Sequence, residues 1–124
     1  MRFDRNAALA GTFFALFVSA TPWFQEIPLS AKAGFSGGLF LTYASIGCLV
    51  ALGPAYGHRI RTGALIGFLY SLPGAVFTSV PYPLAAEAAT YYREFASGGG
   101  RAFCLTLIFG ALAGAFAGFF RRSP

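Results

Sequence analysis

The chain has 124 residues, of which 56% are hydrophobic and only 10% are charged. Soluble domains average about 25% charged residues, and a chain this short cannot enclose so much apolar surface in one core. The composition therefore excludes an ordinary cytosolic enzyme, a disordered tail and a secreted disulfide scaffold. It predicts an integral membrane protein.

Four long uncharged stretches separate the charged residues. Each stretch has the length of a membrane-spanning helix, about 20 residues, and in lipid a helix satisfies its own backbone hydrogen bonds. We therefore expect an all-α integral membrane bundle of four transmembrane helices that forms one membrane domain over residues 1–124. The predicted spans are residues 7–24, 33–56, 62–82 and 102–120.

The first stretch has a second interpretation. Residues 1–20 also resemble a signal peptide, with Arg2 and Arg5 before an apolar run that ends in Val18-Ser19-Ala20. Cleavage there would leave three spans. We expect an uncleaved first span.

The distribution of basic residues predicts the orientation. With four spans, one side carries six arginines and Asp4, whereas the other carries equal numbers of basic and acidic residues. The six arginines are Arg2, Arg5, Arg59, Arg61, Arg121 and Arg122; the opposite side has Lys32, Arg93 and Arg101 with Glu26, Glu87 and Glu94. We expect a protein of the bacterial inner (plasma) membrane with both termini cytoplasmic. The pI of about 9.7 then reflects topology, and no nucleic-acid partner is expected.

The sequence of the second half of the chain is weakly similar to that of the first. The segment Ala8-Leu9-Ala10-Gly11 matches Ala64-Leu65-Ile66-Gly67, and Phe40 and Phe103 each follow a glycine cluster. A duplication would make the two hairpins parallel repeats, related by an axis along the membrane normal. Chance similarity among Gly, Ala and Phe is the alternative.

Small residues recur at every fourth position, which places them on one face of a helix. In lipid, small residues allow helix backbones to approach closely. The predicted helix-packing residues are Gly11, Gly63, Gly67, Gly110, Gly114 and Gly118, and the second span has Gly34 and Gly38, then Gly47 and Ala51. Such contacts fit packing within one chain or between chains. The Phe side chains are expected to cover the opposite faces and to meet lipid.

Residues 84–96 predict a short external amphipathic helix. Leu84, Ala88, Tyr91 and Phe95 share one helical face, and Ser97 with three glycines ends the segment. Anchoring of a connection is the simpler role for this interfacial helix, and a docking surface or a lid is the alternative.

Pro73 and Gly74 fall near the middle of the third span. Proline removes a backbone donor and clashes with the carbonyl four residues earlier, so it predicts a kink. Kinked helices build transporter sites, but proline is also frequent in membrane helices for packing alone. We favour the packing interpretation.

The chain offers little for chemistry. No ionisable residue lies well inside a span, so proton coupling would depend on Glu26 or Glu87 at span edges. His58 lies in a basic loop, where a solvated side chain is expected rather than a pigment or metal ligand. Cys48 and Cys104 are expected to be free thiols that act as small packing residues. The hydrolase, metalloprotease and nucleotide-binding motifs are missing, and we expect no enzyme, no cofactor and no metal.

These features predict a non-catalytic structural or accessory subunit of a membrane assembly or homo-oligomer. Its partners would be the lipid bilayer and other integral membrane subunits or further copies of itself. The alternative is a channel or transporter for a small solute, with its path near Pro73 or at an oligomer axis.

Overall fold

The computed structural model describes residues 3–24, 28–53, 57–79 and 99–122. Within these ranges the chain is helical and contains no strand. The elements are α1 (Arg5–Ser19), the short 3-10 helix η1 (Thr21–Phe24), α2 (Leu29–Leu52), α3 (Arg59–Ser79) and α5 (Gly99–Phe120). The interfacial helix predicted over residues 84–96 lies outside the described residues.

Four helical segments are long and apolar enough to cross a membrane: residues 5–24 (α1 with η1), α2, α3 and α5. This confirms the prediction of an all-helical protein with four candidate spans. The observed bounds differ from the uncharged stretches by a few residues. Helices α3 and α5 begin earlier than predicted, because Arg59 and Arg101 lie in their first turns.

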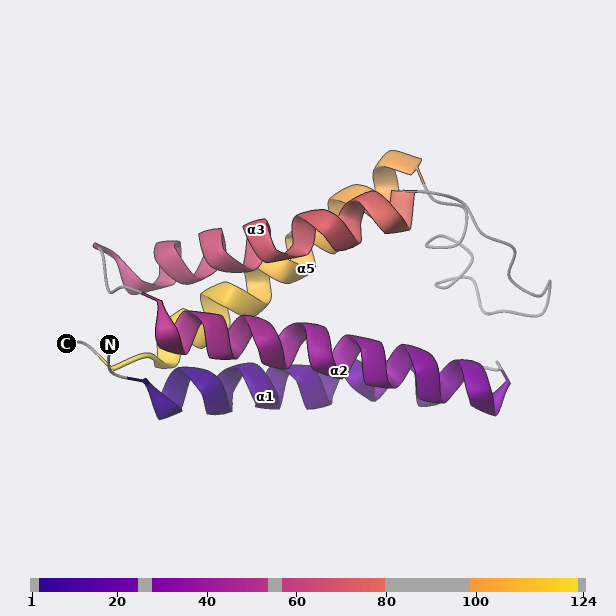
Figure 1. The fold of residues 1–124 in the computed structure, drawn as a ribbon, viewed down its shortest axis with the longest axis horizontal. Coiled ribbons are helices and arrows are strands. Elements are labelled where there is room, and N and C mark those ends of the chain that lie inside the picture. Colours follow the sequence, from indigo (N-terminus) through magenta and orange to yellow (C-terminus); the bar gives the residue numbers. More distant parts are fainter. Residues whose placement is uncertain (1–2, 25–27, 54–56, 80–98, 123–124) are drawn as a thin grey trace.

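The helices form two hairpins, α1 with α2 and α3 with α5 (Figure 1). Helix α5 also contacts both helices of the first hairpin, and α2 contacts α3. Among the described residues α1 and α3 do not touch. The hairpins lie close together at the end that carries both chain termini, and they diverge toward the opposite end (Figure 1).

Every buried residue of α1, α3 and α5 is small, whereas α2 also buries Tyr43, Ile46 and Val50. The buried residues of α3 are Gly63, Gly67, Ser71 and Ala75, which follow one another at intervals of four and therefore share one face. The buried residues of α1 are also small: Ala7, Ala10, Gly11, Ala15 and Ser19. The helices therefore meet with little side-chain volume between their backbones.

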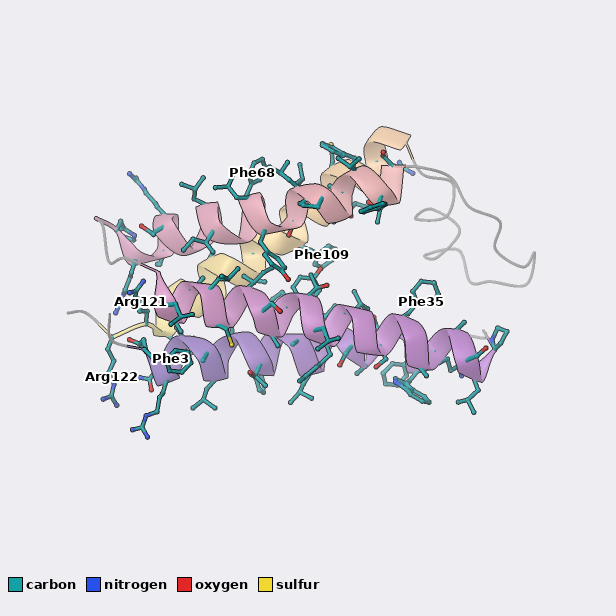
Figure 2. All side chains as sticks on the ribbon, in the orientation of Figure 1. Phe3, Phe35, Phe68, Phe109, Arg121 and Arg122 are labelled. Carbon is teal, nitrogen blue, oxygen red and sulfur yellow. The ribbon has the colours of Figure 1, made fainter. Side chains whose placement is uncertain are left out.

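Bulky apolar side chains lie on the outside of the described bundle. Phe13, Phe17 and Phe77 have exposed fractions of 65%, 74% and 79%, and Figure 2 shows Phe68 projecting from α3 away from the other hairpin. A soluble protein buries such residues and does not expose a large continuous apolar surface. Together with the four long apolar helices, this surface indicates a membrane protein.

Some Phe rings pack within the bundle, which departs from the expectation that Phe side chains cover the opposite faces and meet lipid: Phe14, Phe40 and Phe109 are partly buried against the core. The ring centroid of Phe14 in α1 lies 5.4 Å from that of Tyr43 in α2 and 5.8 Å from that of Phe116 in α5. Successive residues in a helix point about 100° apart, so Phe14 turns inward where its neighbour Phe13 faces outward. These rings join α1, α2 and α5.

Candidate functional site

The ends of four helices meet around Asp4. Its side chain caps α1, because Oδ1 accepts hydrogen bonds from the backbone N–H groups of Asn6 and Ala7 at 3.0 and 3.2 Å. Its Oδ2 accepts the backbone N–H of Arg122 at 2.9 Å. The backbone N–H of Asp4 donates to the carbonyl of Ala51 in α2 at 3.1 Å. One residue therefore connects α1 to the C-terminal ends of α2 and α5.

Two arginines complete this junction. Arg121 is only 8% exposed, and its guanidinium donates to the carbonyl of Gly53 just after α2. Arg59 at the start of α3 donates from Nη1 to the carbonyl of Arg121 at 2.7 Å. Carbonyls at the C-terminal end of a helix have no partner within the helix and carry partial negative charge, so cations are favourable there. Figure 2 shows Arg121 and Arg122 at this end of the molecule.

We call this junction, with the adjoining residues 57–61, the basic end. It carries the exposed side chains of Arg5, Arg61 and Arg122 as well as the two arginines that bind carbonyls. Asp4 is the one acidic residue among the described residues of this end. His58 is exposed here. Sequence reasoning found these charges as a topology signal but missed their contacts, which depend on the meeting of distant helix ends.

Glycines line the contact between α3 and α5. A Cβ atom built on Gly63 would collide with the carbonyl of Gly114, and one on Gly67 would collide with the carbonyl of Gly110. A Cβ on Gly118 would lie 2.5 Å from the carbonyl oxygen of Arg59. The predicted helix-packing glycines of these two spans thus lie opposite one another within one chain.

The first hairpin has the same kind of contact. A Cβ on Gly47 of α2 would lie 2.6 Å from the Cα of Gly11 in α1. The pair Gly67 and Gly110 occupies the corresponding place in the second hairpin. Gly67 is the match of Gly11 in the related segments, and Gly47 and Gly110 each follow the matched residues Phe40 and Phe103 by seven positions.

The glycines of the N-terminal half of α2 differ from those inside the bundle. Nothing lies within 4 Å of a Cβ built on Gly34, Gly37 or Gly38, and all three residues are exposed. Sequence reasoning grouped Gly34 and Gly38 with Gly47 and Ala51. In the structure only Gly47 and Ala51 of that group are buried, because at 100° per residue Gly38 lies on the opposite face of α2 from Gly47.

Helix α3 continues through Pro73 to Ser79. Pro73 and Gly74 are exposed, and Leu69, whose carbonyl loses its helical donor to the proline, is 53% exposed. The buried face of α3 contains Ser71 and Ala75 instead. A path along the outside of α3 at Pro73 would therefore need a second chain to enclose it.

Hydroxyl groups link the helices toward the end opposite the basic end. Thr78 of α3 and Thr106 of α5 share a hydrogen bond of 3.0 Å between their Oγ1 atoms. In the first hairpin, Trp23 donates from Nε1 to Ser36 Oγ at 3.2 Å, and Ser36 donates to the carbonyl of Ser19 at 2.8 Å. Sequence reasoning did not identify Thr106 or Ser36 as hydrogen-bonding residues. Among the described residues these bonds hold each hairpin together.

The cysteines do not act as packing residues. Cys48 and Cys104 are both free and both exposed. The neighbours of Cys48 explain its position, because Ile46, Gly47 and Val50 take the inward face of α2. The expectation that these thiols fill space between helices is therefore wrong.

In the described ranges, no three His, Cys, Asp or Glu residues gather as metal ligands would. Their charged residues lie within the terminal turns of the helices or beside them, as with Lys32 in the first turn of α2 and Arg101 in the first turn of α5. Comparison with protein-family models, with curated proteins and with solved structures found no match to this chain.

Proposed function

We propose that this protein is a non-catalytic integral membrane subunit that packs against other integral subunits or further copies of itself. The observation that carries the proposal is the exposed glycine surface of α2, formed by Gly34, Gly37 and Gly38. By contrast, seven other glycines lie where the backbone of another helix comes within contact distance: Gly11, Gly47, Gly63, Gly67, Gly110, Gly114 and Gly118. A glycine surface toward lipid gains no close packing, whereas a partner helix would gain it.

The distribution of polar groups supports the same role. The described helices carry their charges in terminal turns, whereas transport of protons or ions commonly uses ionisable groups at membrane depth. The hydroxyl groups of Thr78 and Thr106 are hydrogen-bonded to each other. Each also lies within hydrogen-bond distance of a carbonyl in its own helix, that of Ala75 or Ala102. Tight backbone contacts between α3 and α5 leave these two helices no room for a solute between them.

We further propose that the two hairpins are parallel repeats. The support is the pair of corresponding glycine contacts, Gly11 with Gly47 and Gly67 with Gly110. The second helix of each hairpin, α2 or α5, is the one that contacts both helices of the other hairpin, as expected for a two-fold relation along the bundle. The basic residues at the shared end agree with two hairpins that both start on the cytoplasmic side of the bacterial inner membrane.

Substitution of the exposed glycine surface tests the proposed role. Gly38→Leu adds bulk where the chain has no neighbour within 4 Å, so the fold is expected to persist while a partner helix is excluded. Ala33→Leu adds comparable bulk at another exposed position of the same helix and serves as the matched control. The measurement is quantitative mass spectrometry of proteins recovered with tagged chain from native membranes in gentle detergent.

We expect Gly38→Leu to lose the partners that the wild-type chain and Ala33→Leu retain, or, for a homo-oligomer, to lose the association of tagged with untagged chain. The helical content measured by circular dichroism should be equal in the three proteins. Recovery of the same partners with Gly38→Leu as with wild type would refute the role of this surface.

A further inference from the structure

The arginines of the basic end fall into two groups. Arg59 and Arg121 donate their guanidinium hydrogens to backbone carbonyls and thereby join helix ends. The side chains of Arg5, Arg61 and Arg122 have no hydrogen-bond or ion-pair partner among the described residues. The structural role of the first group therefore does not account for the second.

Arg5 and Arg122 belong to one surface. Arg5 directly follows Asp4, and Asp4 accepts the backbone N–H of Arg122, so the two arginines flank the same carboxylate. That carboxylate is occupied, because its Oδ1 accepts two backbone N–H groups of α1 and its Oδ2 accepts that of Arg122. Among the described residues, neither guanidinium forms a hydrogen bond or ion pair with Asp4, so two exposed cationic side chains leave the backbone on either side of this carboxylate.

Two exposed aromatic residues lie close in the sequence to these two arginines. Phe3 next to Asp4 is 47% exposed, and Phe120 at the end of α5 is 46% exposed. Figure 2 shows Phe3 and Arg122 at the same end of the bundle. The surface thus combines guanidinium groups at the ends of two candidate membrane spans with apolar rings at the same level.

We propose that Arg5 and Arg122 bind the phosphate of an anionic phospholipid at the junction of α1 and α5. A guanidinium presents a planar fork of donors that matches phosphate oxygens. Basic residues beside membrane spans attract the anionic lipids of the cytoplasmic leaflet. The location selects a lipid rather than a free anion, because the cations lie at the ends of apolar helices and the rings beside them suit acyl chains.

Lipid titration of the purified full-length protein tests this site. Native mass spectrometry in detergent measures the apparent Kd for the first bound phosphatidylglycerol, and phosphatidylcholine of the same acyl composition gives the neutral comparison. Each exposed arginine is expected to contribute about fivefold to the preference for the anionic lipid, so the pair gives about 25-fold. Arg5→Gln and Arg122→Gln should each reduce the preference about fivefold.

Three comparisons decide the result. Lys32→Gln removes one positive charge at the opposite end of α2 and should leave the preference unchanged. The double variant Arg5→Lys with Arg122→Lys keeps both positive charges and should retain most of the preference for the anionic lipid. If the glutamine variants lose helical content, this double variant still tests the site. Equal binding of the two lipids by the wild type, or an equal loss in Lys32→Gln, would overturn the proposal, as would displacement of the lipid by millimolar inorganic phosphate.

Discussion

The backbone N–H of Arg122 lies 2.9 Å from a carboxylate oxygen of Asp4, its hydrogen-bond acceptor, although the two residues are 118 positions apart in the sequence. This contact brings the start of α1 and the end of α5 to one end of the bundle, where Arg121 and Arg59 also bind carbonyls of neighbouring helix ends. The two hairpins lie closest at this end (Figure 1). The junction around Asp4 is thus expected to stabilise their association.

Loss of the Asp4 side chain tests this junction. Asp4→Ala removes the cap of α1 together with the acceptor for Arg122, and an N-cap alone is worth about 0.5 to 2 kcal/mol. We expect Asp4→Ala to lower the free energy of unfolding by at least about 1 kcal/mol, measured by denaturant titration in micelles with circular dichroism. Asp4→Asn, which still caps a helix, should cost less. Equal stability of Asp4→Ala and wild type would show that the junction contributes nothing.

The contact between α3 and α5 gives a second prediction. Gly114→Ala places a Cβ against the carbonyl of Gly63 and 3.0 Å from the backbone nitrogen of Gly67, so the helices must separate. Overpacking of this kind costs about 1 to 3 kcal/mol, and Gly114→Leu should cost more. Gly34→Ala is the matched control, because nothing lies near its Cβ and alanine favours a helix by about 0.5 to 1 kcal/mol. The free energy of unfolding measured by denaturant titration should therefore fall in Gly114→Ala and rise in Gly34→Ala. An unchanged free energy of unfolding in Gly114→Leu would refute the close contact.

The small-residue surfaces show which features of helix packing could be predicted from the sequence. Intervals of four among residues such as Gly63 and Gly67 indicate a helix face because the helical period is a local property. Which glycine lies opposite is a tertiary property, so the partners Gly110 and Gly114 could not be assigned from spacing. The same limit explains Gly34 and Gly38, which have the spacing of a packing face but lie exposed.

The charged residues also show which properties follow from the sequence and which depend on tertiary contacts. A count of arginines predicts the side of the membrane on which each loop lies, and it needs no contacts. That Arg121 is buried on the carbonyl of Gly53 depends on how the ends of α2 and α5 meet. Sequence reasoning therefore found the basic end but could not separate its structural arginines from its exposed ones.

Topology provides a third prediction. Asp4 and Arg122 lie in contact, so the two ends of the described chain share one side of any membrane that the four helices cross. Reporter fusions at Met1 and at Pro124 should both give the cytoplasmic signal. A cytoplasmic signal from one fusion and an external signal from the other would contradict four spans.

The first span can be checked directly. Helix α1 buries Ala7, Gly11 and Ala15 against the rest of the bundle, and removal of residues 1–20 would leave these contacts unmade. We expect N-terminal sequencing of the protein recovered from membranes to show that residues 1–20 are retained. A mature terminus at Thr21 would establish a cleaved signal peptide and a bundle of three spans.

Substitution of Pro73 separates the subunit from the transporter. Pro73 is exposed and lies away from the buried face of α3, so Pro73→Ala should leave solute flux into proteoliposomes at the background of protein-free liposomes, as for the wild type. The restored backbone donor should make the helix slightly more stable. Flux through the wild-type protein that changes in Pro73→Ala would support a solute path at this position.

The mass of the native particle tests the central proposal most directly. Particles containing the wild-type chain would be extracted from the native membrane with their lipid and weighed by native mass spectrometry. A subunit that packs through its exposed helix surface should be recovered in a particle of defined stoichiometry, containing other integral membrane proteins or several copies of the 13.1 kDa chain. Recovery of single 13.1 kDa chains under these conditions would contradict the proposed function.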